Sequence, residues 1–224
     1  EEFNMSRYTW LLDPGHGGFI DGVYQTAGKR SPVFPDGSRL YEGEFNRDVV
    51  NRIMQLATGY KPGRLCLLPE TYSTLKLDAV NLVDTEADTP LRVRVNKANA
   101  LHREKRNCIY LSVHSNAFGN GKDFNGAAGT CTFHHYKSST GEVLAESLQR
   151  WLSNLTPFRD RGVRANDSWA NFYVLRKTNM PAVLSENGFM TNFDDAIKLL
   201  DPNVRQNIAN AHYNMMLEIE ENGL

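Results

Sequence analysis

The sequence predicts an α/β fold, in which a single domain holds a mixed, mostly parallel sheet flanked by helices on both faces. Short apolar runs alternate along the chain with helical patterns, which is typical of that class. The chain has 224 residues, of which 41% are hydrophobic, enough for one core and short for two ordinary domains. No internal repeat or linker-like stretch divides it, so we expect one domain over residues 6–224.

Strands are expected where short apolar runs end at turn residues. The first covers residues 8–12, with Trp10 as a core side chain, and ends at Asp13. Residues 19–41 are rich in Gly, Pro and Ser and are expected to form a long loop, of a kind that is often functional. A buried strand is expected at residues 108–113. The other expected strands are residues 64–68, 129–136, 173–175 and 182–185.

Helices are expected where apolar residues recur every three or four positions. Residues 42–56 show this pattern in the stripe formed by Phe45, Val49, Ile53 and Leu56. Further helices are expected over residues 91–102, 141–155, 194–200 and 203–221.

The composition argues against several classes of function. Lys and Arg number 25 and Asp and Glu 26, a net charge of -1, which gives no support to a nucleic-acid or anionic-lipid partner. No apolar run approaches the ~18 residues that a membrane helix needs, so we expect no membrane insertion. Cys66, Cys108 and Cys131 are too few to indicate a disulfide framework or a Cys-rich metal site. We expect a monomer.

Three polar side chains stand at the ends of predicted strands. His16 follows the first strand, His114 follows the strand at residues 108–113, and Glu186 follows the strand at residues 182–185. Ligands of open α/β sheets gather at the carboxyl ends of the strands, so these side chains are expected to converge. Each of them alone has an ordinary structural explanation, and the coincidence of three favours a functional site.

Two histidines and a carboxylate are a common catalytic zinc set that leaves a position open for water. Glu42 lies three residues before Phe45, on the buried stripe of its helix, whereas Glu44 lies about 200° round the helix and is expected to face solvent. A carboxylate pointing inward needs a partner, and a metal cation would supply one. Alternatively, Glu42 only complements the helix dipole, and position alone does not decide between the two.

Glu186 is a candidate general base, because a zinc-activated water must lose a proton and a departing amine must gain one. The alternative is an ordinary ion pair at a strand end. Arg94, on the helix before the His114 strand, could orient a carboxylate such as Glu42 or Glu186, or could form a surface pair. His212 is expected at the surface.

These residues lie in segments that resemble the zinc-dependent N-acetylmuramoyl-L-alanine amidases, the amidase-3 type of cell-wall hydrolase. The resemblance spans roughly residues 8–215. The segments that carry it are residues 12–18 (LDPGHGG), Glu42 with Asn46, residues 112–117 (SVHSNA), residues 181–192 (PAVLSENGFMTN), Arg94 with Ala98 and Asn99, and residues 161–163 and 172–175.

The resemblance implies that residues 6–224 are a catalytic domain with one zinc ion per chain. It implies that His16, Glu42 and His114 are the ligands and that Glu186 is catalytic, which selects Glu42 over Glu44. The implied substrate is peptidoglycan, cleaved at the amide between N-acetylmuramic acid and L-Ala. Alternatives are another zinc hydrolase acting on wall peptides, although no His-Glu-x-x-His pattern is present, or a non-catalytic peptidoglycan-binding module.

The implied setting is the cell envelope, in the periplasm or after secretion, for a bacterial enzyme or a phage lysin. The first residues show no charged-then-apolar signal segment, so either a leader has been removed or the protein has none. The chain departs from the usual family pattern in three places. The segment at residues 19–41 is longer, residues 119–127 form a polar loop, and Ser185 and Asn187 replace the more usual Val and Thr beside Glu186.

Overall fold

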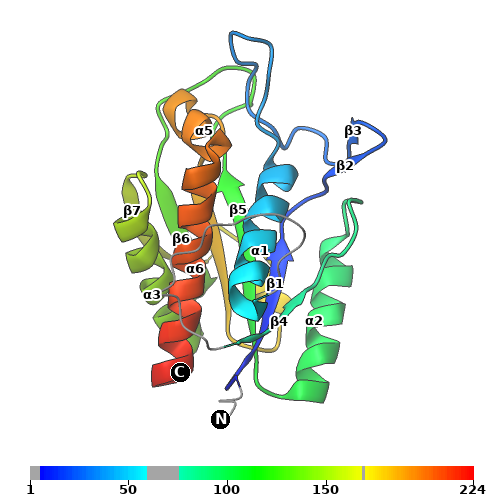
Figure 1. Ribbon diagram of the computed structural model, residues 1–224, viewed down its shortest axis with the longest axis vertical. Helices are drawn as coiled ribbons and strands as arrows, with labels where there is room; N and C mark the ends of the chain where they lie inside the picture. The colour runs from blue at the N-terminus through cyan, green and yellow to red at the C-terminus, as the bar shows by residue number, and fades with distance from the viewer. Residues whose placement is uncertain (1–5, 60–75, 168–169) are drawn as a thin grey trace.

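A six-stranded sheet with the strand order β4-β1-β5-β8-β6-β7 forms the centre of the molecule (Figure 1). The computed structural model describes residues 6–59, 76–167 and 170–224. The strands are β1 (Thr9–Pro14), β4 (Asp78–Asn81), β5 (Cys108–Asn116), β6 (Thr130–His135), β7 (Asp160–Asn166) and β8 (Ala182–Phe189). Neighbouring strands run parallel except for β6 and β8, which are antiparallel. The predicted mixed, mostly parallel sheet is confirmed.

Helices cover both faces of this sheet, as predicted. The helices α1 (Glu42–Thr58), α3 (Ser139–Leu155) and α6 (Pro202–Asn222) pack together on the face turned to the viewer in Figure 1. The helices α2 (Leu91–Lys105) and α4 (Tyr173–Lys177) contact each other on the opposite face. The short helix α5 (Phe193–Leu200) follows β8 and packs against α6.

Each face of the sheet has its own hydrophobic core, because successive side chains of a strand point to opposite faces. On β1, Trp10 and Leu12 belong to the core under α1, α3 and α6. Leu11, between them, belongs to the core under α2 and α4. All three side chains are fully buried, so the expectation that Trp10 is a core residue is confirmed.

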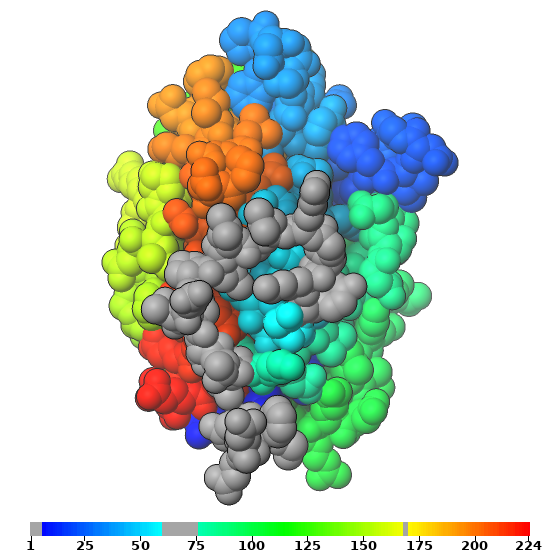
Figure 2. Space-filling model, viewed as in Figure 1, coloured from blue at the N-terminus to red at the C-terminus, as the bar shows by residue number. Residues whose placement is uncertain are grey.

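The segment at residues 19–41 contains a small hairpin where a loop was expected. Its strands are β2 (Phe19–Ile20) and β3 (Val23–Tyr24), and the turn between them places Asp21 at φ 49° and Gly22 at φ 76°. A two-residue turn with both φ angles positive is the preferred hairpin connection, and Asp-Gly is its usual sequence. In Figure 2 this hairpin stands out from the upper right of the molecule, beside the segment that leads into α2.

Two edge strands, β4 and β7, were not predicted. Both carry mixed polar sequences, because an edge strand is partly solvated and lacks a continuous apolar run. The prediction of a strand at residues 173–175 was wrong, because this segment lies in α4. A run of three apolar residues is too short for its period to distinguish a strand from a helix. The strand expected at residues 64–68 lies outside the described residues.

Within the described residues, no helix combines the length and the apolar composition that crossing a membrane requires.

Candidate metal centre

Two strand ends and one helix start meet at the same edge of the sheet. β1 and β5 are parallel neighbours with Pro14 opposite Val113, so His16 and His114 emerge side by side at their carboxyl ends. Helix α1 begins there with Glu42. Its Oε1 atom lies 3.1 Å from Nδ1 of His114 and 3.3 Å from Nε2 of His16. Potential ligand atoms of the three residues all lie within 4.8 Å of one another.

The carboxylate of this cluster is buried, and the two imidazoles reach the surface. The side chain of Glu42 is 2% exposed, against 20% for His16 and 15% for His114. The two rings are nearly perpendicular, at 88°, with their centroids 5.2 Å apart. The cluster is therefore shielded from solvent on the side of Glu42 and accessible on the side of the two imidazoles, which suits a site that holds an ion and admits a substrate.

Glycine at position 15 lets the two histidines come together. A Cβ atom on Gly15 would lie 2.1 Å from Cε1 of His114, so any other residue would displace that ring. His16 itself has a positive φ of 64°, which costs free energy in a residue other than glycine. Its carbonyl is held by two guanidinium groups, from Arg47 Nη1 at 2.8 Å and from Arg94 Nη2 at 2.9 Å. These bonds fix the strained conformation that presents the ring.

The first turn of α1 packs directly on the His16 loop. A Cβ atom on Gly43 would lie 1.8 Å from the carbonyl oxygen of Gly17, so glycine is needed for this close approach. One turn later, Asn46 donates from Nδ2 to the carbonyl oxygen of Gly15 at 3.0 Å. The helix that carries Glu42 is therefore locked to the loop that carries His16.

Arg94 supports this loop through a partner that sequence reasoning did not identify. Its side chain is 1% exposed, and Nη1 lies 2.6 Å from Oδ1 of Asp13. It also donates to the carbonyl oxygens of Pro14, His16 and Thr89. The suggestion that Arg94 pairs with Glu42 or Glu186 was wrong, since its carboxylate partner lies three residues before His16. The guanidinium thus ties α2 to the end of β1.

Asp13 is the buried centre of that support. Its carboxylate accepts hydrogen bonds from Tyr110 at 2.6 Å and from Ser112 at 2.8 Å, in addition to the bond from Arg94. Burial raises the pKa of Asp13, but the charge of Arg94 and these hydrogen bonds outweigh it, so the pKa lies below its usual value. The sequence placed Asp13 at a strand end without indicating that it would be a buried anion.

The electrostatics of Glu42 favour a cation. Burial raises its pKa, but hydrogen bonding and charge from His114 and His16 outweigh it and hold the pKa well below the usual range. The carboxylate is therefore ionised. Its Oε2 atom is buried and has no hydrogen-bond partner. A buried anion with an unpartnered oxygen and two imidazoles beside it is a donor set that a zinc ion fits.

Glu186 lies next to this cluster on the neighbouring strand. In the parallel register of β5 and β8 it is opposite His114, so both side chains project from the same face. It is 8% exposed, and its Oε2 atom is buried without a hydrogen-bond partner. Burial and the negative charge of Glu42 raise its pKa well above the usual value, and Lys29 opposes this. Such a carboxyl group holds a proton more readily than a solvated one.

Glu44 points away from the cluster, and its side chain is 45% exposed, in keeping with the expectation that it faces solvent. Its carboxylate also lies 2.8 Å from Nη1 of Arg205 in α6. His212 is a correction, because the expected surface residue is fully buried in α6. This helix packs against both α1 and α3, which accounts for the burial.

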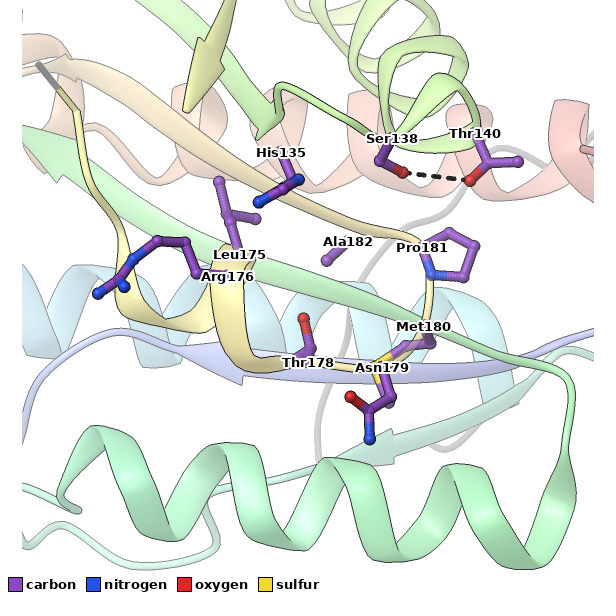
Figure 3. A pocket seen from close by; sticks show the side chains of 10 residues that line it. All are labelled: His135, Ser138, Thr140, Leu175, Arg176, Thr178, Asn179, Met180, Pro181 and Ala182. Atoms are coloured by element: carbon purple, nitrogen blue, oxygen red, sulfur yellow. Dashed lines mark hydrogen bonds between the residues drawn. The ribbon is translucent and has the colours of Figure 1, made fainter. Parts of the chain in front are cut away.

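A cavity of about 360 Å³ lies at the opposite end of β8, near Ala182 (Figure 3). Its lining includes His135, at the end of β6, and Ser138, which caps α3 by accepting a hydrogen bond from the backbone of Gly141. None of the four candidate site residues lines it. The cavity is therefore separate from the cluster at the carboxyl ends of β1 and β5.

The sequence profile of the N-acetylmuramoyl-L-alanine amidase family Amidase_3 matches residues 11–218, nearly the whole chain. The chain belongs to this family. It is 33% identical over 222 residues to an uncharacterized cell wall amidase of Bacillus anthracis, covering 95% of this chain and 35% of that protein. It is 31% identical over 193 residues to the N-acetylmuramoyl-L-alanine amidase LytC of Bacillus subtilis, covering 85% of this chain and 31% of that protein.

This family member thus spans about a third of the length of those two curated relatives. Its fold matches that of the crystal structure of an N-acetylmuramoyl-L-alanine amidase from Clostridium difficile 630. The TM-score is 0.73 at 25% sequence identity, and the match covers 97% of this chain and 98% of that one. The α/β architecture is therefore that of an amidase domain.

Proposed function

We propose that residues 6–224 form the catalytic domain of a zinc-dependent N-acetylmuramoyl-L-alanine amidase. The reaction is hydrolysis of the amide that joins the lactyl group of N-acetylmuramic acid to L-Ala in peptidoglycan. The observation that carries the proposal is the His16, Glu42 and His114 cluster, with Glu186 in register beside it. Family membership and the name of the Bacillus subtilis relative support the choice of substrate and of the bond that is cleaved.

In this proposal one zinc ion per chain is held by His16, Glu42 and His114. The unpartnered Oε2 atom of Glu42 supports this assignment, because a buried carboxylate oxygen is costly without a hydrogen bond or a cation. Bound there, zinc would polarise the scissile carbonyl and lower the pKa of a water molecule. The two imidazoles at the open side leave room for the substrate to approach.

Glu186 is the proton carrier of the proposed reaction. Its carboxylate takes a proton from the attacking water and delivers it to the nitrogen of L-Ala, as the carbon–nitrogen bond breaks. Burial and the nearby charge of Glu42 raise its pKa, which makes the proton easier to retain between the two transfers. A charge on Zn²⁺ would lower that pKa again, so the carboxylate would be ready to act as a base.

We also propose that the chain acts at the cell wall, in the periplasm or after secretion, and the name of the Bacillus anthracis relative, a cell wall amidase, supports action at the wall. In this proposal the partner is peptidoglycan, and the chain acts as a monomer without nucleic acid. The alternatives are a zinc peptidase acting on wall peptides and a module that binds peptidoglycan without cleaving it.

Mass spectrometry of digested peptidoglycan distinguishes these three functions. An amidase releases stem peptides with new L-Ala amino termini and leaves the glycan strands intact. A peptidase creates other new termini, and a binding module creates none. The digestion should stop when a chelator removes the metal and resume when zinc is added back. Release of L-Ala termini in the presence of the chelator would contradict the role of zinc.

A further inference from the structure

Glu186 is flanked on its strand by two buried polar residues. Because side chains alternate along a strand, Ser185 and Asn187 point to the face opposite Glu186, toward α6. Both are completely buried, and so is His212, which faces them from α6. A buried polar group destabilises the fold unless it is hydrogen-bonded, so three together at this place call for an explanation.

These residues form a hydrogen-bonded chain with a fixed direction. Nδ1 of His212 lies 2.7 Å from the carbonyl oxygen of Ile208 and must donate to it, so Nε2 is the accepting nitrogen. The hydroxyl of Ser185, at 2.9 Å, donates to Nε2. Nδ2 of Asn187 donates to that hydroxyl at 3.0 Å. Burial lowers the pKa of His212 to about 4, so the ring is neutral at neutral pH, as this arrangement requires.

The hydrogen-bonded chain ends at the backbone of His114, a candidate zinc ligand. Nδ2 of Asn187 also donates to the carbonyl oxygen of His114 at 2.9 Å. Two acceptors thus surround the same nitrogen, which fixes the orientation of the amide. The contact lies where the register of β5 and β8 shifts, between His114 and Asn116, and where Gly188 has a φ of 68°. The side chain of Asn187 therefore joins the two strands at an irregular point of their ladder.

We propose that His212, Ser185 and Asn187 are positioning residues that hold the backbones of His114 and Glu186 in the relative placement needed for zinc binding and proton transfer. This inference rests on the proposed function. The three residues touch neither metal nor substrate. They connect helix α6 to both strands of the site, and they act by limiting how far His114 and Glu186 can move apart.

The effect of such support has a known scale. Loss of the groups that orient metal ligands typically weakens metal binding or activity about 10–100-fold. Displacement of reacting groups by about 1 Å can cost roughly 100-fold in rate. Removing these hydrogen bonds should therefore lower zinc affinity and kcat and leave KM nearly unchanged.

Three variants and one control test the proposal. Ser185→Ala removes the hydroxyl, and Asn187→Leu removes the amide at similar volume. Ser185→Thr keeps a hydroxyl on a strand position that suits a β-branched residue. The control is Ser147→Ala, because Ser147 is also buried and donates from α3 to Glu218 of α6 at 3.0 Å. This hydrogen bond also ends on α6, but it involves no residue of β5 or β8.

The measurements are zinc affinity by competition with a chromophoric chelator, the melting temperature of the metal-free protein, and kcat and KM on peptidoglycan. We expect Ser185→Ala and Asn187→Leu to bind zinc about 10-fold more weakly and to lose about 10-fold or more in kcat. Ser185→Thr should restore both values, and Ser147→Ala should lower only the melting temperature.

A purely structural role predicts another pattern. If Ser185→Ala and Asn187→Leu melt earlier, as Ser147→Ala does, but keep normal zinc affinity and kcat, the proposal is wrong. Ser185→Ala and Asn187→Leu test the hydrogen-bonded chain independently, so if one of them misfolds, the other still decides the question. A wild-type protein that binds zinc but does not cleave peptidoglycan would contradict the proposed function alone, since the zinc affinities still test the positioning role. A wild-type protein that binds no zinc would overturn both.

Discussion

Replacing Arg94 by Lys should weaken both the fold and the proposed metal site. The guanidinium is buried and bonds Asp13 and the carbonyl oxygens of Pro14, His16 and Thr89. A lysine ammonium can keep the ion pair, but it cannot reach three carbonyls that lie around a planar fork. If two bonds to charged donors are lost, at ~1.5–3 kcal/mol each, the free energy of unfolding falls by about 3–6 kcal/mol.

Urea denaturation of the metal-free protein measures this loss, and chelator competition measures the zinc affinity. We expect zinc binding to weaken as well, because Arg94 holds the carbonyl of His16 in its strained conformation. Arg92→Lys is the matched control, since Arg92 lies two residues earlier on α2 and is exposed. If Arg94→Lys unfolds at the same urea concentration as Arg92→Lys and binds zinc equally well, the supporting role of Arg94 is refuted.

Three other predictions concern single side chains. Elemental analysis should show that Glu42→Gln loses zinc and that Glu44→Gln keeps it. Glu44→Gln should lose only the half-exposed ion pair with Arg205, which contributes about 1 kcal/mol or less to the free energy of unfolding. The reverse result would mean that the wrong carboxylate was assigned. His114→Ala should lose most of its zinc, and full retention would remove His114 from the site. Burial lowers the pKa of His212 from 6.5 to about 4. On acidification the unfolded protein therefore binds this proton before the folded protein does, and the free energy of unfolding should fall by roughly 3 kcal/mol as pH drops from 6.5 to 4. A His212→Gln protein with the same acid dependence as the wild type would contradict that assignment.

The positions of the candidate site residues followed from local sequence and one rule of topology. His16 follows β1 as expected. His114 and Glu186 lie inside β5 and β8, because these strands continue past the apolar runs that predicted them, to Asn116 and Phe189. The three side chains still meet at one edge, since β1, β5 and β8 are parallel neighbours. Glu42 was separated from Glu44 by its place on the apolar stripe of one helix. Apart from that rule of topology, these arguments use only residues within one element, where the period of side chains is fixed by backbone geometry.

The supporting contacts could not be predicted in the same way. Arg94 is paired with Asp13, which lies 81 positions away in the chain, and nothing in the sequence of either segment selects that partner. His212 is buried because α6 is covered on more than one side, so its helical phase alone did not separate buried from exposed positions. The hairpin at residues 19–24 had a local signal, the pair Asp21 and Gly22, within strands too short for periodicity to show.

The proton-carrying role of Glu186 is the claim on which the proposed enzyme depends. Gln at this position keeps the shape of the side chain, and the ligand cluster is untouched, so zinc content and melting temperature should match the wild type. Loss of a general acid and base typically lowers the rate ~10²–10⁴-fold. The decisive measurement is therefore the rate at which zinc-loaded Glu186→Gln protein releases stem peptides from peptidoglycan. We predict a loss of at least about 100-fold with the metal retained, and a near-normal rate in the zinc-loaded variant would contradict the account.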